Sequence, residues 1–208
     1  MIKKYLRRYT SLPVLLDMLM NEKITLLDPA SWEDRNDSFY IEKYREKKGL
    51  KTVLALCFTE RAETFHHWKV FAGDSSGVCI RFNRNEFLDC FRKKQGIHSG
   101  SVSYILMRDL QNTPPSLEEL PFIKRKQYED EAEFRIIYQN KNKIHRSKNF
   151  PLDISCIDRI TLSPWMPSPV AKTVKKVISG VHGCGKIKLI RTGVVESSAW
   201  QKIVKGLT

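Results

Sequence analysis

The chain lacks several patterns that would assign it at once to a common class of protein. It has 208 residues and five cysteines, and no two cysteines form a Cys-x-x-Cys pair, so neither a disulfide framework nor a zinc site is indicated. No apolar run approaches the ~18 residues that a membrane-spanning helix requires. A P-loop and a Gly-x-Gly-x-x-Gly turn are also missing, which argues against a nucleoside triphosphatase and a Rossmann enzyme.

Acidic residues are few relative to basic ones. The chain has 23 Asp and Glu residues against 36 Lys and Arg, a net charge of +13. Such an excess attracts polyanions, of which nucleic acid is the first candidate, followed by anionic membranes and acidic proteins. The basic start has no apolar core or cleavage site typical of a secretory signal, so we expect a cytoplasmic protein without membrane attachment. The basic connector 140–149 supplies the candidate nucleic-acid-binding residues Lys141, Lys143, Arg146 and Lys148.

Short alternating and short amphipathic segments follow one another along the chain, and the 41% share of hydrophobic residues is enough for a core. The spacing predicts strands over 5–10, 24–27, 51–59, 78–82, 100–107, 131–138, 157–162 and 186–190. It predicts helices over 12–21, 60–71, 85–94 and 171–179. The polar stretch 31–38 is expected to form a loop. The sequence therefore predicts an α+β protein, a single domain over residues 1–208 with a mixed or split sheet and short flanking helices.

The most informative segment is 131–138, whose alternation predicts a strand. On that strand Glu131, Glu133 and Arg135 share one face, and apolar side chains occupy the other. Two carboxylates then lie about 7 Å apart along the strand. Their mutual repulsion raises the pKa of one of the two carboxyl groups, and the adjacent guanidinium of Arg135 lowers it again. The pattern is typical of a catalytic carboxylate pair, and equally of a salt-bridged polar face on a sheet.

The first predicted strand is a candidate cofactor site. It contains Tyr5, Arg8, Tyr9 and Thr10, and arginine suits phosphates while tyrosine offers a ring for stacking. A dinucleotide presents both targets. The alternative is a basic edge strand with buried tyrosines. Thr59 ends the apolar strand 51–59, a position that often lines a site.

A metal site is not expected. His66 and His67 are adjacent, and neighbouring residues on a helix point in different directions, so the two imidazoles cannot easily bind one ion.

Several segments occur in the order found in a known family: 8–12, 28–37, 57–59, 68–71, 77–82, 128–135 and 160–164. Together they resemble a large prokaryotic family of uncharacterised domains often found near defence genes. The chain departs from that pattern at Ser38, where a proline commonly follows the Asn-Asp pair.

The layout also resembles the ADP-ribosyltransferase superfamily, a split mixed-sheet fold that holds NAD in a cleft. The resemblance implies NAD as co-substrate and no metal. It also implies roles for individual residues: Arg8 binds the NAD phosphates or ribose, Tyr9 or Tyr5 stacks on nicotinamide, Thr59 supports the site, and Glu133 or Glu131 is catalytic.

The leading hypothesis from the sequence is an NAD-dependent ADP-ribosyltransferase-like toxin or defence effector that modifies nucleic acid, RNA rather than DNA. Such a toxin needs an antitoxin, and the basic surface suits an acidic one. The first alternative is a non-catalytic nucleic-acid-binding or protein-binding module. The second is a metal-dependent nuclease, although the chain lacks the usual Asp…Glu-x-Lys arrangement.

Overall fold

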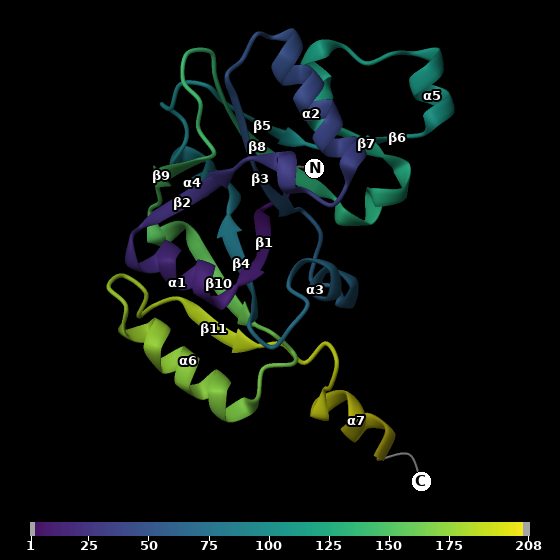
Figure 1. The fold of residues 1–208 in the computed structure, drawn as a ribbon. Coiled ribbons are helices and arrows are strands. Elements are labelled where there is room, and N and C mark those ends of the chain that lie inside the picture. Colours follow the sequence, from purple (N-terminus) through teal and green to yellow (C-terminus); the bar gives the residue numbers. More distant parts are fainter. Residues whose placement is uncertain (1–2, 206–208) are drawn as a thin grey trace.

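A computed structural model describes residues 3–205, and these residues form an α+β fold around one mixed sheet (Figure 1). The order of its strands is β11-β10-β4-β1-β3-β2-β9, with β8 paired to β3 and β5 paired to β8. The strands of this sheet are β1 (Tyr5–Ser11), β2 (Lys23–Leu27), β3 (Thr52–Thr59), β4 (Gly77–Asn83), β5 (Ile97–Ser101), β8 (Glu133–Asn140), β9 (Ser147–Pro151), β10 (Ile157–Leu162) and β11 (Lys188–Arg191). A separate parallel pair consists of β6 (Ser103–Ile105) and β7 (Ile123–Arg125).

The sheet divides at β3. Its pairing with β1 is at a single position, Arg7 opposite Thr59, and its pairing with β2 is also at one position, Leu27 opposite Ala55. By contrast, β1 pairs with β4 over its whole length, and β3 pairs with β8 over eight positions. The β10–β11 pair is parallel, whereas β1, β3, β4 and β8 pair antiparallel. The predicted α+β class with a mixed, split sheet is therefore confirmed.

Helices cover both faces of the sheet (Figure 1). They are α1 (Leu12–Met20), α2 (Arg35–Lys47), α3 (Phe65–Phe71), α4 (Arg84–Asp89), α5 (Met107–Asn112), α6 (Ser168–Gly180) and α7 (Ser198–Lys205). Short 3₁₀ helices lie at Pro29–Ser31, Leu117–Phe122, Lys126–Glu131 and Ile154–Cys156. No helix among residues 3–205 is long and apolar enough to cross a membrane.

Alternation along the strands decides which face each helix covers. In β1, Leu6 is fully buried and joins Ile80, Ile160 and residues of α1 and α6 in the main core. The opposite face carries Tyr9, which packs with Trp68 of α3. Because successive side chains of a strand point to opposite faces, α1 and α6 lie on one side of this part of the sheet and α3 on the other.

Several expectations about local structure are wrong. The end of the connector expected over 140–149 belongs to β9, because it pairs antiparallel with β2. The strand expected over 100–107 is divided between β5 and β6, which belong to different sheets. The stretch 31–38, expected to be a loop, includes the start of α2. The side chain of Asp34 accepts hydrogen bonds from the main-chain N–H groups of Asn36 and Asp37 and so caps the helix. The acidic strand begins at Glu133, since Glu131 ends a 3₁₀ helix and Ala132 adopts a left-handed conformation with φ of 42°.

Candidate active site

A cavity of about 550 Å³ lies where β1 and β3 separate. Its walls come from β1, from the chain leading into α2, from the end of β3, from α3 and from the segment between β7 and β8. This volume falls within the ~300–1,000 Å³ typical of small-molecule pockets. Five of the segments that carried the family resemblance therefore meet at one place: 8–12, 28–37, 57–59, 68–71 and 128–135.

Arg135 of β8 anchors the carboxylates beside this cavity. Its side chain is fully buried and donates to both oxygens of Glu133 at 2.8 and 2.9 Å. It also donates to both oxygens of Asp37 at 3.0 and 2.7 Å and to the carbonyl of Pro121 at 2.8 Å. Trp32 lies with its ring 4.8 Å from the guanidinium carbon. Arg135 is thus the centre of a buried ion network that joins β8 to α2.

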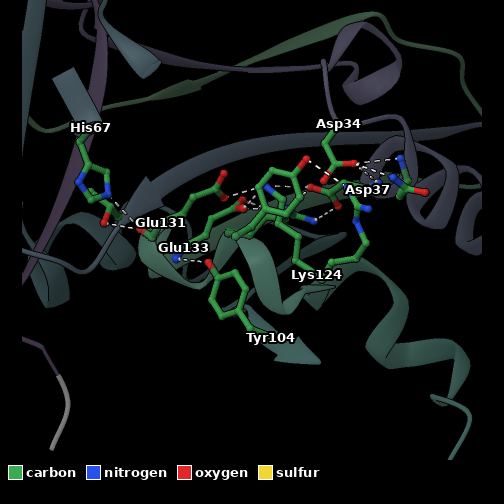
Figure 2. Close-up of polar contacts among 12 residues, drawn as sticks. Asp34, Asp37, His67, Tyr104, Lys124, Glu131 and Glu133 are labelled. Carbon is green, nitrogen blue, oxygen red and sulfur yellow. Dashed lines mark hydrogen bonds and ion pairs between the residues drawn. The ribbon is translucent and has the colours of Figure 1, made fainter. Parts of the chain in front are cut away.

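Lys124 is the second cation of the network (Figure 2). Its Nζ lies 2.6 Å from Glu131, 3.5 Å from Glu133 and 3.6 Å from Asp37. Figure 2 shows the three carboxylates converging on this amine from different elements. The network therefore holds three acidic and two basic side chains in nearly dry surroundings.

The two glutamates differ in their pKa values. Burial would raise the pKa of Glu133, but Arg135 and then Lys124 outweigh burial and lower it to about 2. Burial raises the pKa of Glu131 despite Lys124, and the charge of Glu133 adds to the rise. The pKa of Asp37 is also raised, mainly by burial. Glu133 is therefore held ionised, whereas Glu131 is the glutamate of the two that takes up a proton at higher pH.

Neighbouring side chains fix the backbone around both glutamates. The hydroxyl of Thr59 donates to the carbonyl of Glu131 at 2.6 Å, and His67 Nε2 lies 3.4 Å from the same oxygen. Burial lowers the pKa of His67, which favours the neutral form of its imidazole. The main-chain N–H of Glu133 donates to the hydroxyl of Tyr104 at 2.7 Å (Figure 2). These contacts support the left-handed turn at Ala132, which is strained for a residue with a Cβ.

The β1 side of the cavity is positive. Arg8 donates to the carbonyl of Cys57 at 3.1 Å and Arg7 to the carbonyl of Arg61 at 2.9 Å. Neither guanidinium forms an ion pair with a carboxylate among residues 3–205. Tyr9 is next to them, with the ring of His67 stacked at 5.6 Å. The cavity therefore has a negative end at the glutamates and a positive end at β1.

The structure brings together five of the seven candidate catalytic and cofactor-binding residues. Glu131, Glu133, Arg8, Tyr9 and Thr59 all line the cavity. Their individual roles stay predictions.

The remaining candidates lie elsewhere. Thr10 and Tyr5 do not line the cavity, and Tyr5 instead has the guanidinium of Arg81 at 4.3 Å from its ring. The basic connector follows the far end of β8, seven residues beyond Glu133, or roughly 23 Å at ~3.3 Å per residue. Its assignment to nucleic acid also stays a prediction.

Several residues that line the cavity were not candidates from sequence. Arg7 is one of them, next to the candidate Arg8. Asp37 and Trp32 lie in the segment expected to be a loop, and Lys124 lies seven residues before Glu131 without any periodic pattern. Asp37 and Trp32 belong to a segment that carried the family resemblance, which was the available signal for them. Among residues 3–205, no group of three or more His, Cys, Asp or Glu side chains is arranged to hold a metal ion.

Comparisons with known proteins give fold neighbours. No protein-family model matches the chain, and no curated protein matches it. Among solved structures, it is similar to Thermus sp. 2.9 DarT in complex with NAD+, with a TM-score of 0.48 and 9% identity over 94% of this chain and 98% of that one. It is also similar to the same protein in complex with ADP-ribosylated ssDNA, with a TM-score of 0.46 and 11% identity over 94% and 97% of the two chains.

Proposed function

We propose that the protein breaks the bond between nicotinamide and ribose in NAD+ and transfers ADP-ribose to nucleic acid. The carrying observation is the polarity of the cavity. One end of the cavity holds three carboxylates, those of Glu131, Glu133 and Asp37. The other end holds two guanidinium groups, those of Arg7 and Arg8, which have no carboxylate partner among the described residues. NAD+ has a matching polarity, because its nicotinamide ring is cationic and its pyrophosphate is anionic.

The positive end suits the pyrophosphate. Arginine binds phosphate through a planar fork of donors, and Arg7 and Arg8 each use one Nη atom on a main-chain carbonyl. With nicotinamide at the opposite end, its bond to ribose lies beside Glu133. Tyr9, Trp32 and Tyr128 add aromatic surface to the cavity walls.

The two glutamates suit different steps of the transfer. When the bond between nicotinamide nitrogen and ribose C1′ breaks, both electrons leave with nicotinamide, which becomes neutral, and positive charge develops on the ribose. The ionised Glu133 stabilises that charge and accepts a hydrogen bond from a ribose hydroxyl. The acceptor then attacks C1′ with a lone pair, and Glu131 takes the proton that the acceptor loses.

The acceptor class follows from charge. The net charge of +13 favours a polyanionic acceptor, and nucleic acid is the most abundant one in a cell. We expect RNA to be modified in preference to DNA. The family resemblance supports a role as a toxin or defence effector with an acidic antitoxin.

The experiment follows both products. Purified protein is incubated with adenylate-labelled NAD+ and with RNA or DNA, and nicotinamide release and label transfer are measured. Glu133→Gln should lower both by about 100-fold or more, since removing one transition-state contact costs 10²–10³ in rate. Glu131→Gln should lower transfer more than nicotinamide release. Glu129→Gln is the matched control, because Glu129 is exposed and, within residues 3–205, forms an ion pair with Lys126 alone.

Thermal melting of each variant separates lost catalysis from lost fold. If Glu133→Gln and Glu131→Gln both fold and both remain fully active, the catalytic assignment is refuted. If the wild-type protein releases no nicotinamide with any acceptor, the transferase itself is refuted.

A non-catalytic binding module is the second candidate, and the complete pairing of Arg135 favours it. In that case Glu133→Gln changes stability and no reaction exists to be lost. The geometry is less suited to the metal-dependent nuclease, because Lys124 Nζ stands where the three carboxylates converge and a cation would have to displace it.

A further inference from the structure

A single line of paired residues crosses the sheet from the catalytic end to the far edge. Glu133 of β8 pairs with Thr59 of β3, and Thr59 pairs with Arg7 of β1. Beyond Arg7, the next residues in register are Arg81 of β4, Arg159 of β10 and Lys188 of β11. Directly paired residues point to the same face, so these side chains lie in one row. We call Arg7, Arg81, Arg159 and Lys188 the basic row.

The basic row is costly for the isolated protein. Like charges directly opposite one another on neighbouring strands repel. Arg81 is the member that a carboxylate neutralises within residues 3–205, through Asp158 at the bulge in β10. Arg159 also has a buried Nε without a hydrogen-bond partner. The other three cations of the row have no carboxylate partner among residues 3–205, and such a row fits a ligand that carries repeated negative charges.

The face that carries the row is open where the row runs. The main core, with α1 and α6, packs against the opposite face of β1, β4 and β10. On the side of the row, α3 covers the end of β1 at Tyr9, leaving Arg7, Arg81 and Arg159 partly exposed and Lys188 exposed. Figure 1 shows α3 beside β1.

We propose that the basic row binds the sugar-phosphate backbone of the acceptor nucleic acid and leads it to Glu133; this role rests on the proposed transferase. Neighbouring strands lie ~4.8 Å apart, so the row spans about 14 Å. That length corresponds to about four nucleotide steps, and so to about five phosphates, at ~3.4 Å per nucleotide in a helical strand. Tyr5 lies on the same face two residues before Arg7, and its ring packs against the guanidinium of Arg81 at 4.3 Å.

NAD+ alone does not account for the row. Its two phosphates need a short positive segment, and Arg7 is the row member that borders the cavity. Arg159 and Lys188 lie four and five strand spacings from Glu133, or about 19 and 24 Å. The two outer cations therefore suit a ligand longer than the co-substrate.

Binding is tested without catalysis. Fluorescein-labelled single-stranded RNA and DNA of 12 nucleotides and the same mixed sequence are titrated with protein, and anisotropy is followed between 50 and 200 mM KCl. The test variants are Arg159→Gln/Lys188→Gln and the exposed single change Lys188→Gln. The matched control is Lys172→Gln/Lys176→Gln, which removes the same charge from the exposed side of α6 on the opposite face of the sheet.

Each phosphate contact with a single strand contributes about 0.7 to the slope of the logarithm of the binding constant against the logarithm of the salt concentration, called the salt slope below. The double variant should therefore bind about tenfold more weakly at 150 mM salt. Its slope should fall by about 1.4, that of Lys188→Gln by about 0.7, and the control should stay within twofold of wild type. The proposal would be overturned if the double variant bound the strand as tightly as wild type, or if the control lost as much affinity as the double variant. It would also be overturned if affinity fell only in a further variant, Lys141→Gln/Lys143→Gln.

Two further measurements separate the alternatives. Polyglutamate of matched charge should displace the labelled strand less well than an unlabelled oligonucleotide, and equal displacement identifies a surface for an acidic protein instead. Nicotinamide release by wild-type protein is measured in the same preparation. A protein that binds the strand through the basic row but releases no nicotinamide refutes the transferase and leaves the row as a nucleic-acid surface.

Discussion

Replacing Arg135 with methionine removes the charge that holds Asp37 and Glu133 inside the protein. The side chains of these carboxylates are only 1% and 6% exposed, so they cannot turn to water without local unfolding. Removing one partner of a buried ion pair costs about 3–5 kcal/mol. Since Arg135 neutralises two carboxylates, we expect a loss of about 5 kcal/mol, which is a large share of the 5–15 kcal/mol typical of a folded domain.

Urea denaturation at pH 7 measures this loss. Arg92→Met is the matched control, because Arg92 is 75% exposed in its pair with Asp89 and such pairs contribute about 1 kcal/mol or less. If Arg135→Met does not fold, Arg135→Met/Glu133→Gln should be the more stable of the two, since it leaves one buried charge fewer without a partner. A loss below about 1 kcal/mol in Arg135→Met would refute the buried network.

The pH dependence supplies an independent check. The folded pKa of Glu133 is about 2, against about 4.3 for an unfolded chain, so its ionised form contributes about 3 kcal/mol above pH 4.3. That contribution is lost as the pH falls toward 2. In Arg135→Met, burial raises the pKa of Glu133 and Asp37, so the variant gains stability as the pH falls from 7. The stability difference between wild type and variant should therefore shrink on acidification, and a constant difference would contradict the assignment.

Two further changes test the segment around Glu131. Lys124→Met removes the cation 2.6 Å from Glu131 and should raise the pKa of that carboxyl. The acidic limb of the pH–rate profile for label transfer should then move to higher pH. An acidic limb that does not move would argue against Glu131 as the base. Ala132→Gly relieves the strain of the positive φ of 42° and should raise the free energy of unfolding, measured by urea denaturation, by about 0.5–1 kcal/mol. An unchanged or lower midpoint of the urea transition would show that residue 132 is unstrained.

The strands were predictable because their signal is local. Alternation of apolar residues identified β1, β3, β4, β8 and β10 to within two or three residues, and it placed Glu133 and Arg135 on one face. The same alternation misplaced the start of β8. A positive φ at an alanine leaves no trace in sequence, and Ala132 continues the apolar positions of the strand.

The partners of the charges were not predictable, because they depend on contacts across the sheet. Asp37 is 98 residues from Arg135, and Lys124 reaches Glu131 from a separate two-stranded sheet. The basic row is likewise invisible in sequence, since its four members come from four strands and acquire a common face only through register. The connector 140–149 became a candidate because its lysines and arginine lie close together in the sequence, where such a cluster can be recognised without the fold.

A salt-bridged sheet face and a catalytic carboxylate pair are compatible descriptions of these glutamates. Glu133 can remain ionised in a buried position only because Arg135 and Lys124 compensate the cost of burial. Three carboxylates against two cations still leave one negative charge, which suits a developing cation on ribose. Glu131 contacts Lys124 but not Arg135, and its side chain is 18% exposed. The network therefore immobilises one glutamate as a fixed charge and leaves the other free to exchange a proton, so substitutions at 131 and 133 should affect different steps of one reaction.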